Sequence, residues 1–392
     1  MTNNYDVVFV GGAIMASSTA YNLLKEDPKM KIAIIEKDPT YQHAATSLAI
    51  GAVRQQFSTK VNIRLARQSI EMFENFKDIM ESKYGKPDIN FRQYGYLFIV
   101  SPEKWPTAEE NIILQKEEGV EVELLTANQV GSMIPDLNLE GVAGGSFCRR
   151  DGFTDPQQIL TGYVNKVKEL GAEFVKDEVV EIETYKGKVK GVVCKTGNKY
   201  SSNVVVNAAG PWAGLVGEMA GVEVPVMPLP FDVYACKIPI ELNIGKSYTA
   251  SHVGANWIRE HLDGDTVIAS KSRFDSQYGF NFTPDQNYYY EQVWPTFASL
   301  IKGLDKMRLF NSWRGLYEYN PHDQNAIIDE HPELEGFYLI NGFSGHGVMQ
   351  APAAGRGLAE LIFNKGFKTI DLSELCLKRI YNNKLCIEKM CV

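Results

Sequence analysis

The sequence predicts an α/β fold in which a mostly parallel, helix-covered sheet is combined with an inserted α+β part rich in antiparallel strands. Three observations predict it. A strand–glycine–helix–strand unit opens the chain at residues 6–36, a buried strand ending in small residues lies at 204–213, and a Gly- and Ala-rich turn enters a helix at 342–356. Turns of this kind let backbone N–H groups approach a flat or phosphate-bearing ligand closely.

The opening unit has the length of a dinucleotide-binding βαβ motif. A buried strand at 6–10 is broken by Gly11-Gly12, a helical pattern covers 13–25, and a second strand at 31–35 ends at Glu36. The helix N-terminus would hold a pyrophosphate, and Glu36, 25 residues after Gly11, would accept hydrogen bonds from ribose hydroxyls. Ala13 and Ala16 replace the second and third glycines of the motif. On this motif alone, a strand and helix that bind nothing remain an alternative.

The two distant segments, VVVNAAGPWA at 204–213 and GFSGHGVMQAPAAGR at 342–356, favour FAD. With them the chain resembles the D-amino-acid oxidase superfamily of FAD enzymes, in the branch of sarcosine oxidase, dimethylglycine dehydrogenase and glycine oxidase. Segments 40–58, 317–329 and 367–373 are most similar to a subgroup of FAD-dependent oxidoreductase domain-containing proteins, which is linked to respiratory complex assembly. The resemblance runs essentially from end to end.

The resemblance implies how the chain divides. Residues 1–88, 147–220 and 322–392 would form a Rossmann-like FAD-binding domain, and 89–146 and 221–321 a mostly antiparallel substrate domain. Strand-like patterns inside the insertions agree, at 91–100, 233–238, 252–258 and 266–270. Asp155 and Pro156 mark a helix start, as N-cap and first helical residue.

The motifs and the resemblance together define the residues expected to contact the cofactor. They are Gly11, Gly12, Ala13, Ile14, Met15, Glu36, Lys37, Thr46, Ser47, Val180, Ala208, Gly210, Trp212, Gly342, Gly345, His346, Gly347, Val348 and Met349.

Oxidation at a flavin needs a protein that orients the substrate and places positive charge near the ring. The resemblance implies that Arg54 is the active-site arginine, against the alternative of a surface ion pair. His346 lies in the SGHG turn, as a structural or catalytic residue. Met349 stands where sarcosine oxidases carry a substrate-binding lysine, so another residue must supply the positive charge of that lysine. The candidates are Arg314, Lys271, Arg273 and His252, each with solvated charge as the alternative.

We expect FAD to be bound without a covalent link. Sarcosine oxidases attach it through a cysteine in the region equivalent to Leu316–Glu318, and dimethylglycine dehydrogenases through a histidine whose place Leu48 takes here. His43, five residues upstream, reads as a polar loop residue. Aromatic walls for a substrate are offered by Tyr94, Tyr96, Tyr234, Tyr317 and Tyr319.

Composition restricts the partners. A net charge of −8 argues against nucleic acid, the apolar stretch at 204–230 is too interrupted to span a membrane, and six cysteines without a C-x-x-C pair suggest neither a metal site nor a disulfide framework. A strand pattern beginning at Tyr5 leaves no room for a signal peptide, so we expect a cytoplasmic protein.

The leading expectation is an FAD-dependent oxidation of the C–N bond of a small amine or amino acid, with N-methyl or other secondary or tertiary amino acids favoured. Electrons would pass to oxygen or to an electron-transfer partner. Two alternatives remain: an FAD-containing assembly or interaction protein with little turnover, and oxidation of a 2-hydroxy acid.

Overall fold

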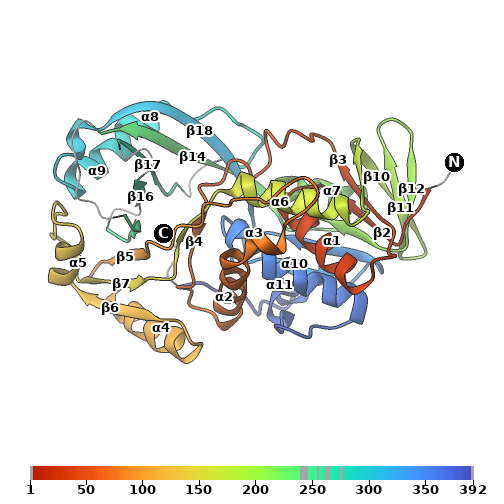
Figure 1. Cartoon of the computed structure of the whole chain (residues 1–392), viewed down its shortest axis with the longest axis horizontal. Coiled ribbons are helices and arrows are strands. Elements are labelled where there is room, and N and C mark those ends of the chain that lie inside the picture. Colours follow the sequence, from red (N-terminus) through yellow and green to blue (C-terminus); the bar gives the residue numbers. More distant parts are fainter. Residues whose placement is uncertain (1–2, 239–245, 254–255, 261–264, 274–276, 390–392) are drawn as a thin grey trace.

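The fold of the computed structural model is α/β, and its two main sheets lie side by side along the long axis (Figure 1). The structure describes residues 3–238, 246–253, 256–260, 265–273 and 277–389. The six-stranded sheet lies to the right in Figure 1 and the eight-stranded sheet to the left. The parts of the chain that carry them keep the names that the sequence analysis expects, FAD-binding domain and substrate domain.

The sheet of the FAD-binding domain is parallel except at one edge. Its order is β19 (Ile327–Glu330), β20 (Phe337–Asn341), β13 (Val205–Asn207), β2 (Val7–Val10), β3 (Ile32–Glu36) and β9 (Glu173–Lys176). Only the β19–β20 pair is antiparallel among the described pairings of this sheet. The strands of this sheet thus come from three distant parts of the chain. The carboxyl ends of β2, β3 and β13 lie at one edge of the sheet, where these strands lead into the turns predicted from the sequence.

A smaller sheet packs beside it, in the order β1 (Asn3–Asn4), β12 (Lys199–Ser201), β11 (Lys188–Cys194) and β10 (Val179–Tyr185). The helices of this part of the chain are α1 (Ile14–Glu26), α2 (Lys60–Glu74), α3 (Phe76–Ile79), α6 (Pro156–Glu169), α7 (Ala213–Met219), α10 (Gly347–Asn364) and α11 (Lys378–Tyr381). Asp155 caps α6 as predicted, because its side chain accepts from the N–H groups of Gln157 and Gln158.

Helices α1 and α10 pack closely because small residues face each other. A Cβ added to Gly355 would lie 2.3 Å from Oγ of Ser18, and that hydroxyl donates to the carbonyl of Ala351 at 2.8 Å. This contact brings the N-termini of both helices to the same cleft.

The substrate domain carries a long mixed sheet. Its order is β18 (Arg308–Tyr319), β14 (Met227–Lys237), β17 (Thr266–Lys271), β16 (Asn256–Glu260), β15 (Tyr248–Ser251), β5 (Tyr96–Val100), β7 (Gly144–Cys148) and β6 (Val122–Thr126). All described pairings are antiparallel except β15 with β5. Its helices are α4 (Trp105–Glu117), α5 (Ala127–Met133), α8 (Gln286–Tyr288) and α9 (Trp294–Leu300), and a short ribbon of β4 (Ala52–Val53) and β8 (Gly152–Phe153) lies between the domains.

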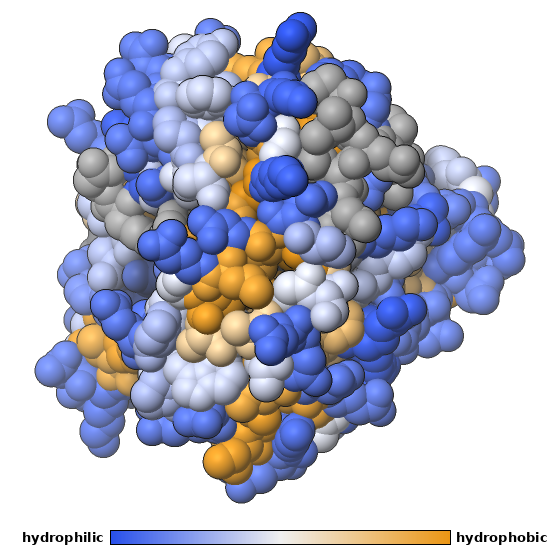
Figure 2. All heavy atoms as spheres, turned by 90° about the vertical axis from the view of Figure 1, so that its left-hand side faces the viewer, coloured by the Kyte–Doolittle hydropathy of each residue, from blue (hydrophilic) through white to orange (hydrophobic). Residues whose placement is uncertain are grey.

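Three details differ from the sequence analysis. The strand predicted at 91–100 begins only at Tyr96. Of the strand predicted at 252–258, residues 256–258 open β16, His252 and Val253 lie in a turn after β15, and 254–255 lie outside the described residues. The boundary expected at 147 lies within β7. The outer end of the substrate domain is mostly hydrophilic, with apolar side chains gathered in the middle of that face (Figure 2). None of the helices in the described parts of the chain has the length and apolar character that a membrane crossing requires.

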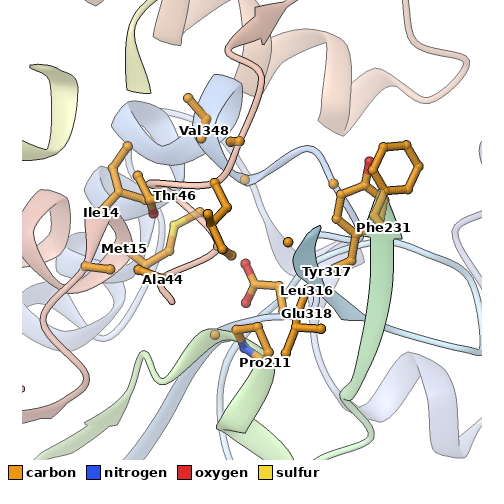
Figure 3. Close-up of a pocket in the computed structure, with 18 of the residues that line it drawn as sticks. Ile14, Met15, Ala44, Thr46, Pro211, Phe231, Leu316, Tyr317, Glu318 and Val348 are labelled. Carbon is orange, nitrogen blue, oxygen red and sulfur yellow. The ribbon is translucent and has the colours of Figure 1, made fainter. Parts of the chain in front are cut away.

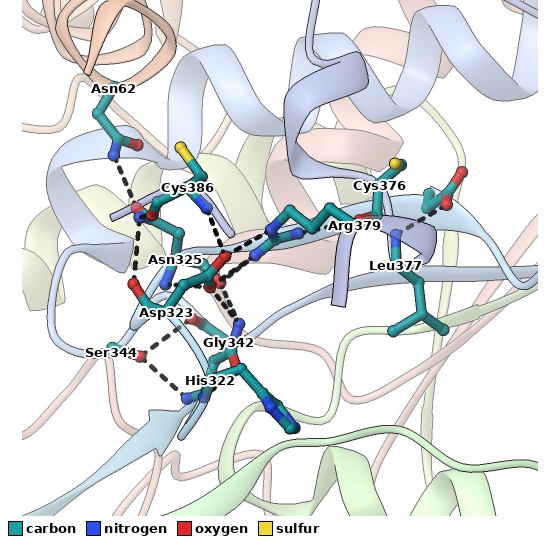
Figure 4. A network of polar contacts seen from close by, with 12 residues as sticks. Asn62, His322, Asp323, Asn325, Gly342, Ser344, Cys376, Leu377, Arg379 and Cys386 are labelled. Atoms are coloured by element: carbon teal, nitrogen blue, oxygen red, sulfur yellow. Dashed lines mark hydrogen bonds and ion pairs between the residues drawn. The ribbon is translucent and has the colours of Figure 1, made fainter. Parts of the chain in front are cut away.

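The C-terminal segment is tied to the loop before β19 by a buried ion pair (Figure 4). Arg379 donates to both carboxylate oxygens of Asp323 at 2.7 and 2.9 Å, and the backbone N–H of Cys386 donates to the same carboxylate at 3.0 Å. Since removing one partner of a buried pair leaves an uncompensated charge, this segment is part of the fold of the FAD-binding domain.

Candidate active site

One large pocket lies between the carboxyl ends of β2, β3 and β13 and the inner face of the substrate sheet. Figure 3 shows its two walls, with Ile14, Met15 and Thr46 on one side and Phe231 and Tyr317 on the other. The predicted cofactor residues that line it are Gly11, Gly12, Ala13, Ile14, Met15, Glu36, Lys37, Thr46, Ala208, Gly210, Trp212, Gly345, His346, Gly347, Val348 and Met349.

Three predicted cofactor residues do not line the pocket. Val180 is 46% exposed, and Val179 lines the pocket in its place, because successive residues of β10 face opposite sides. Ser47 lies between two lining residues, Thr46 and Leu48, and contributes no surface itself. Gly342 acts through the loop, since its N–H donates to the carboxyl of Glu318 at 3.3 Å.

The first end of the pocket suits an adenosine diphosphate group. Gly11 has φ +90°, and a Cβ there would lie 2.6 Å from the carbonyl oxygen of Ala208, so the turn can pass close to a ligand only with glycine. Glu36 accepts from the N–H groups of Gly12 and Asp38, each at 2.8 Å. Burial raises the pKa of Glu36, and these two N–H groups oppose that shift. Its carboxylate keeps lone pairs free for ribose hydroxyls.

An aromatic wall stands beside Glu36. The ammonium of Lys37 lies 3.6 Å from the centroid of the Trp212 ring, and Trp212 stacks on Phe280 at 5.2 Å. Burial lowers the pKa of Lys37. Together with Gly11 and Glu36, this wall fits an FAD group, with the pyrophosphate at the N-terminus of α1.

Arg54 lies at the opposite end of the pocket and is 5% exposed. Its guanidinium lies 4.0 Å from the Phe57 ring centroid, donates to the carbonyl of Gln56, and has one nitrogen 3.1 Å from Nε2 of His346. Within the described residues Arg54 forms no ion pair. A buried guanidinium that faces a pocket without a carboxylate partner is suited to bind an anion.

His346 is neutral in this arrangement. Burial, and secondly the charge of Arg54, lower the pKa of His346 to about 3. Its Nε2 therefore accepts from Arg54, and the ring proton is on Nδ1. Gly345, just before it, has φ +99°, and a Cβ there would lie 2.9 Å from the ring of Tyr317. The turn thus requires glycine in order to lie against that ring.

A set of aromatic rings roofs the Arg54 end. Phe231 stacks on Tyr317 at 4.7 Å, Tyr248 lies 5.8 Å from Trp257, and Tyr96 stacks on Tyr248 at 4.5 Å. These rings come from five strands of the substrate sheet and line the pocket.

Of the tyrosines singled out in the sequence, Tyr96, Tyr317 and Tyr319 line the pocket. Tyr94 is 38% exposed, and Tyr234 is buried with its hydroxyl bonded to the carbonyl of Asp285. Phe231, Tyr248 and Trp257 also line the pocket and were not predicted to do so. The alternating pattern of their strands indicates that such residues share a face, but not which face meets the pocket.

The other proposed cations are already paired or lie elsewhere. Arg314 makes two 2.7 Å bonds to the carboxylate of Asp232, and Lys271 donates to the hydroxyl of Thr296 at 3.1 Å; neither lines the pocket. His252 bonds the carbonyl of Ile99 outside the pocket, and Arg273 lines it while paired with Asp285 at 2.8 Å. The prediction that Arg314 or Lys271 supplies the missing charge is therefore wrong.

Two buried carboxyl groups were not anticipated. Asp151 accepts from the backbone and side chain of Gln55 and from the side chain of Gln56, next to Arg54, and burial raises its pKa to about 6. Glu318, 7% exposed, lines the pocket itself, and burial raises its pKa to about 8. Among the described residues, no cluster of His, Cys, Asp and Glu could hold a metal ion.

The chain is similar to known proteins in sequence and in fold. The chain is 32% identical to FAD-dependent oxidoreductase domain-containing protein 1 of Xenopus laevis, over 98% of this chain and 84% of that protein. Glycine oxidase of Bacillus licheniformis is 24% identical over 94% of this chain and 96% of its own length. The crystal structure of L-proline dehydrogenase from P. horikoshii superposes with a TM-score of 0.88 at 26% identity, covering 98% of this chain and all of that one. The family of FAD dependent oxidoreductases matches residues 6–361, and the chain belongs to it.

Proposed function

We propose that this protein oxidises the C–N bond of a small amino acid, with a secondary or tertiary amine favoured, using FAD bound without a covalent link. The observation that carries the proposal is Arg54, a buried guanidinium without an ion-pair partner among the described residues, at the aromatic end of the cofactor pocket. An amino-acid carboxylate matches its planar fork of donors.

The ring faces of Phe231, Tyr317 and Trp257 suit the other end of such a substrate, since aromatic faces attract ammonium and N-methyl groups. Bound FAD supplies a two-electron acceptor, its N5 atom, for the hydride on the carbon next to nitrogen. An ammonium substrate would first lose its proton; hydride loss would then leave an iminium ion, which becomes an imine where the nitrogen carries a hydrogen, and water would hydrolyse it to a carbonyl compound and an amine.

The residues of the protein bind and orient the substrate and exclude water from the site. Arg54 holds the carboxylate and is itself oriented by the carbonyl of Gln56 and by neutral His346. Nδ1 of His346 keeps its proton and so remains a hydrogen-bond donor. No lysine stands at the position of Met349, so the proposed carboxylate site rests on Arg54.

Non-covalent binding is supported by the residues at the two attachment positions. Leu48, Leu316, Tyr317 and Glu318 all line the pocket, and none is a cysteine or histidine. His43 also lines the pocket, but its ring packs on Phe282 at a centroid distance of 4.3 Å.

The test is anaerobic mixing of the purified holoprotein with separate panels of N-methyl amino acids, primary amino acids and 2-hydroxy acids, following loss of the visible flavin absorbance. Bleaching by an N-methyl amino acid is the expected result. Bleaching by 2-hydroxy acids alone would replace C–N by C–O oxidation.

A second candidate is an assembly or interaction protein that retains FAD as a structural element. It is favoured by the similarity to FAD-dependent oxidoreductase domain-containing protein 1, whose name states no substrate. A holoprotein that dithionite reduces, but that no panel compound reduces, would support it.

A further inference from the structure

Glu318 places a carboxyl group inside the cofactor pocket. It lies on β18, is 7% exposed, and projects into the cavity between Met15 and Pro211 (Figure 3). One oxygen, Oε2, accepts from the N–H of Gly342 at 3.3 Å. The other, Oε1, makes no hydrogen bond with any described residue.

The position of Oε1 relates it to the cofactor cleft. A Cβ added to Gly347, the first residue of α10, would lie 3.2 Å from the Met15 methyl group and 3.4 Å from Oε1 of Glu318. Met15 belongs to the first turn of α1, where the pyrophosphate of FAD would bind. The free oxygen therefore faces the stretch of cleft that the pyrophosphate and the adjoining ribityl chain of the cofactor must cross.

An ionised carboxylate there would oppose the phosphates, whereas a neutral carboxyl group offers them an O–H donor. No charged side chain of the described residues acts on Glu318: burial raises its pKa to about 8, and only the N–H of Gly342 opposes this. In the adjoining loop the titratable neighbour is His346, which is neutral, and the first turn of α1 contributes no titratable side chain.

We propose that Glu318 binds FAD in its protonated form, donating a hydrogen bond from its carboxyl group to the phosphate–ribityl part of the cofactor, so that loss of this proton weakens FAD binding. The proposal concerns the cofactor alone and is independent of which substrate the protein oxidises.

The experiment measures the FAD dissociation constant of apoprotein between pH 6 and 9, by quenching of flavin fluorescence. For a group with a pKa of about 8, wild-type affinity should be constant near pH 6–7 and about tenfold weaker at pH 9. Glu318→Gln keeps a donor of similar shape, so its affinity should match the wild type at pH 6.5 and stay constant to pH 9.

Two further variants isolate the effect. Glu318→Leu removes the donor and should weaken FAD binding by about two- to tenfold at pH 6.5, the value of one hydrogen bond. Asp38→Asn is the matched control: Asp38 also lines the pocket, and hydrogen bonds from Thr40 lower its pKa, so it is ionised throughout and its removal should leave the wild-type pH profile.

The other titratable side chains that line the cleft, which include Glu36, Lys37, Tyr41, Asp177, Glu178 and Tyr317, are the same in the wild type and in Glu318→Gln. The difference between these two proteins therefore reports on Glu318. An identical pH profile in both would overturn the proposal. So would wild-type affinity that rises with pH, and this measurement needs no variant to fold.

Discussion

Replacing Arg54 by methionine is the sharpest perturbation of the site. Methionine can occupy the space between the Phe57 and Phe98 rings, 4.0 and 5.3 Å from the guanidinium, but it offers no charge and no donor. Because Arg54 has no ion-pair partner among the described residues, its loss uncovers no opposite charge. We therefore expect the variant to fold, to retain FAD, and to lose its hold on a substrate carboxylate.

The magnitude follows from the contacts. Two of the five guanidinium N–H groups serve Gln56 and His346, which leaves donors for a carboxylate in a site that excludes water. Losing one such electrostatic donor costs about 2.7–4 kcal/mol, or about 10²–10³ in rate. Arg54→Lys keeps the charge without the fork and should fall between the wild type and Arg54→Met.

The assay is stopped-flow reduction of the bound flavin by a reducing amino acid, together with FAD content and melting temperature. Arg314→Met is the matched control, since it breaks a buried pair with Asp232 and should cost about 3–5 kcal/mol of stability without removing a pocket residue. Wild-type reduction in Arg54→Met, or a melting temperature lowered as far as in Arg314→Met, would refute the reasoning and return Arg54 to a structural role.

Three other outcomes are expected. Acid precipitation should release all the flavin as FAD, and colour remaining in the pellet would direct peptide mapping to His43 and Tyr317. Glu36→Ala should weaken FAD binding about ten- to a hundredfold, through loss of about 1.5–3 kcal/mol of charge-assisted hydrogen bonds, and an unchanged dissociation constant in a folded variant would remove Glu36 from the site. Asp151 has a folded-state pKa of about 6, above its unfolded value, so it stabilises the fold at low pH and loses that contribution as the pH rises through 6. The free energy of unfolding, measured by denaturant titration, should therefore change in favour of Asp151→Asn relative to the wild type between pH 4 and 7.5, by up to about 3 kcal/mol. A constant difference between the two proteins would contradict this.

Sequence patterns predicted those parts of the fold whose conformation depends on residues nearby in the chain. The turn at Gly11 and the cap at Asp155 each depend on neighbours a few residues away or on one βαβ unit, and each has the predicted geometry. Glu36 ends β3 as predicted, and its contact with ribose stays a prediction. Errors arose where the phase or the partner is set by tertiary structure. Val180 was one residue out of phase on its strand, and the strand predicted at 252–258 includes turn residues His252 and Val253.

The charged residues of the site show the same limit: their partners and their burial are set by tertiary structure, which the local sequence does not reveal. Nothing in the local sequence separates Arg54 from Arg314, because the difference between them is Asp232, a residue of the neighbouring strand β14. The resemblance to amine-oxidising flavoenzymes singled out Arg54. Glu318 could not be predicted, because a glutamate within an alternating strand is normally solvated, and only the packing of β18 beneath the loop at 342–347 buries it.

The strand order of the FAD-binding sheet has a consequence for biosynthesis. β2 and β3 are made first, but β13 separates β2 from β20, and β20 is preceded by the whole substrate domain and followed by α10 and the segment that bears Arg379. A ribosome-bound chain that has reached residue 320 therefore holds its βαβ motif without the strand and helix that complete the cleft. The cleft is complete only once β20 and α10 have been synthesised, and until then the half-built sheet exposes parallel edges that pair slowly.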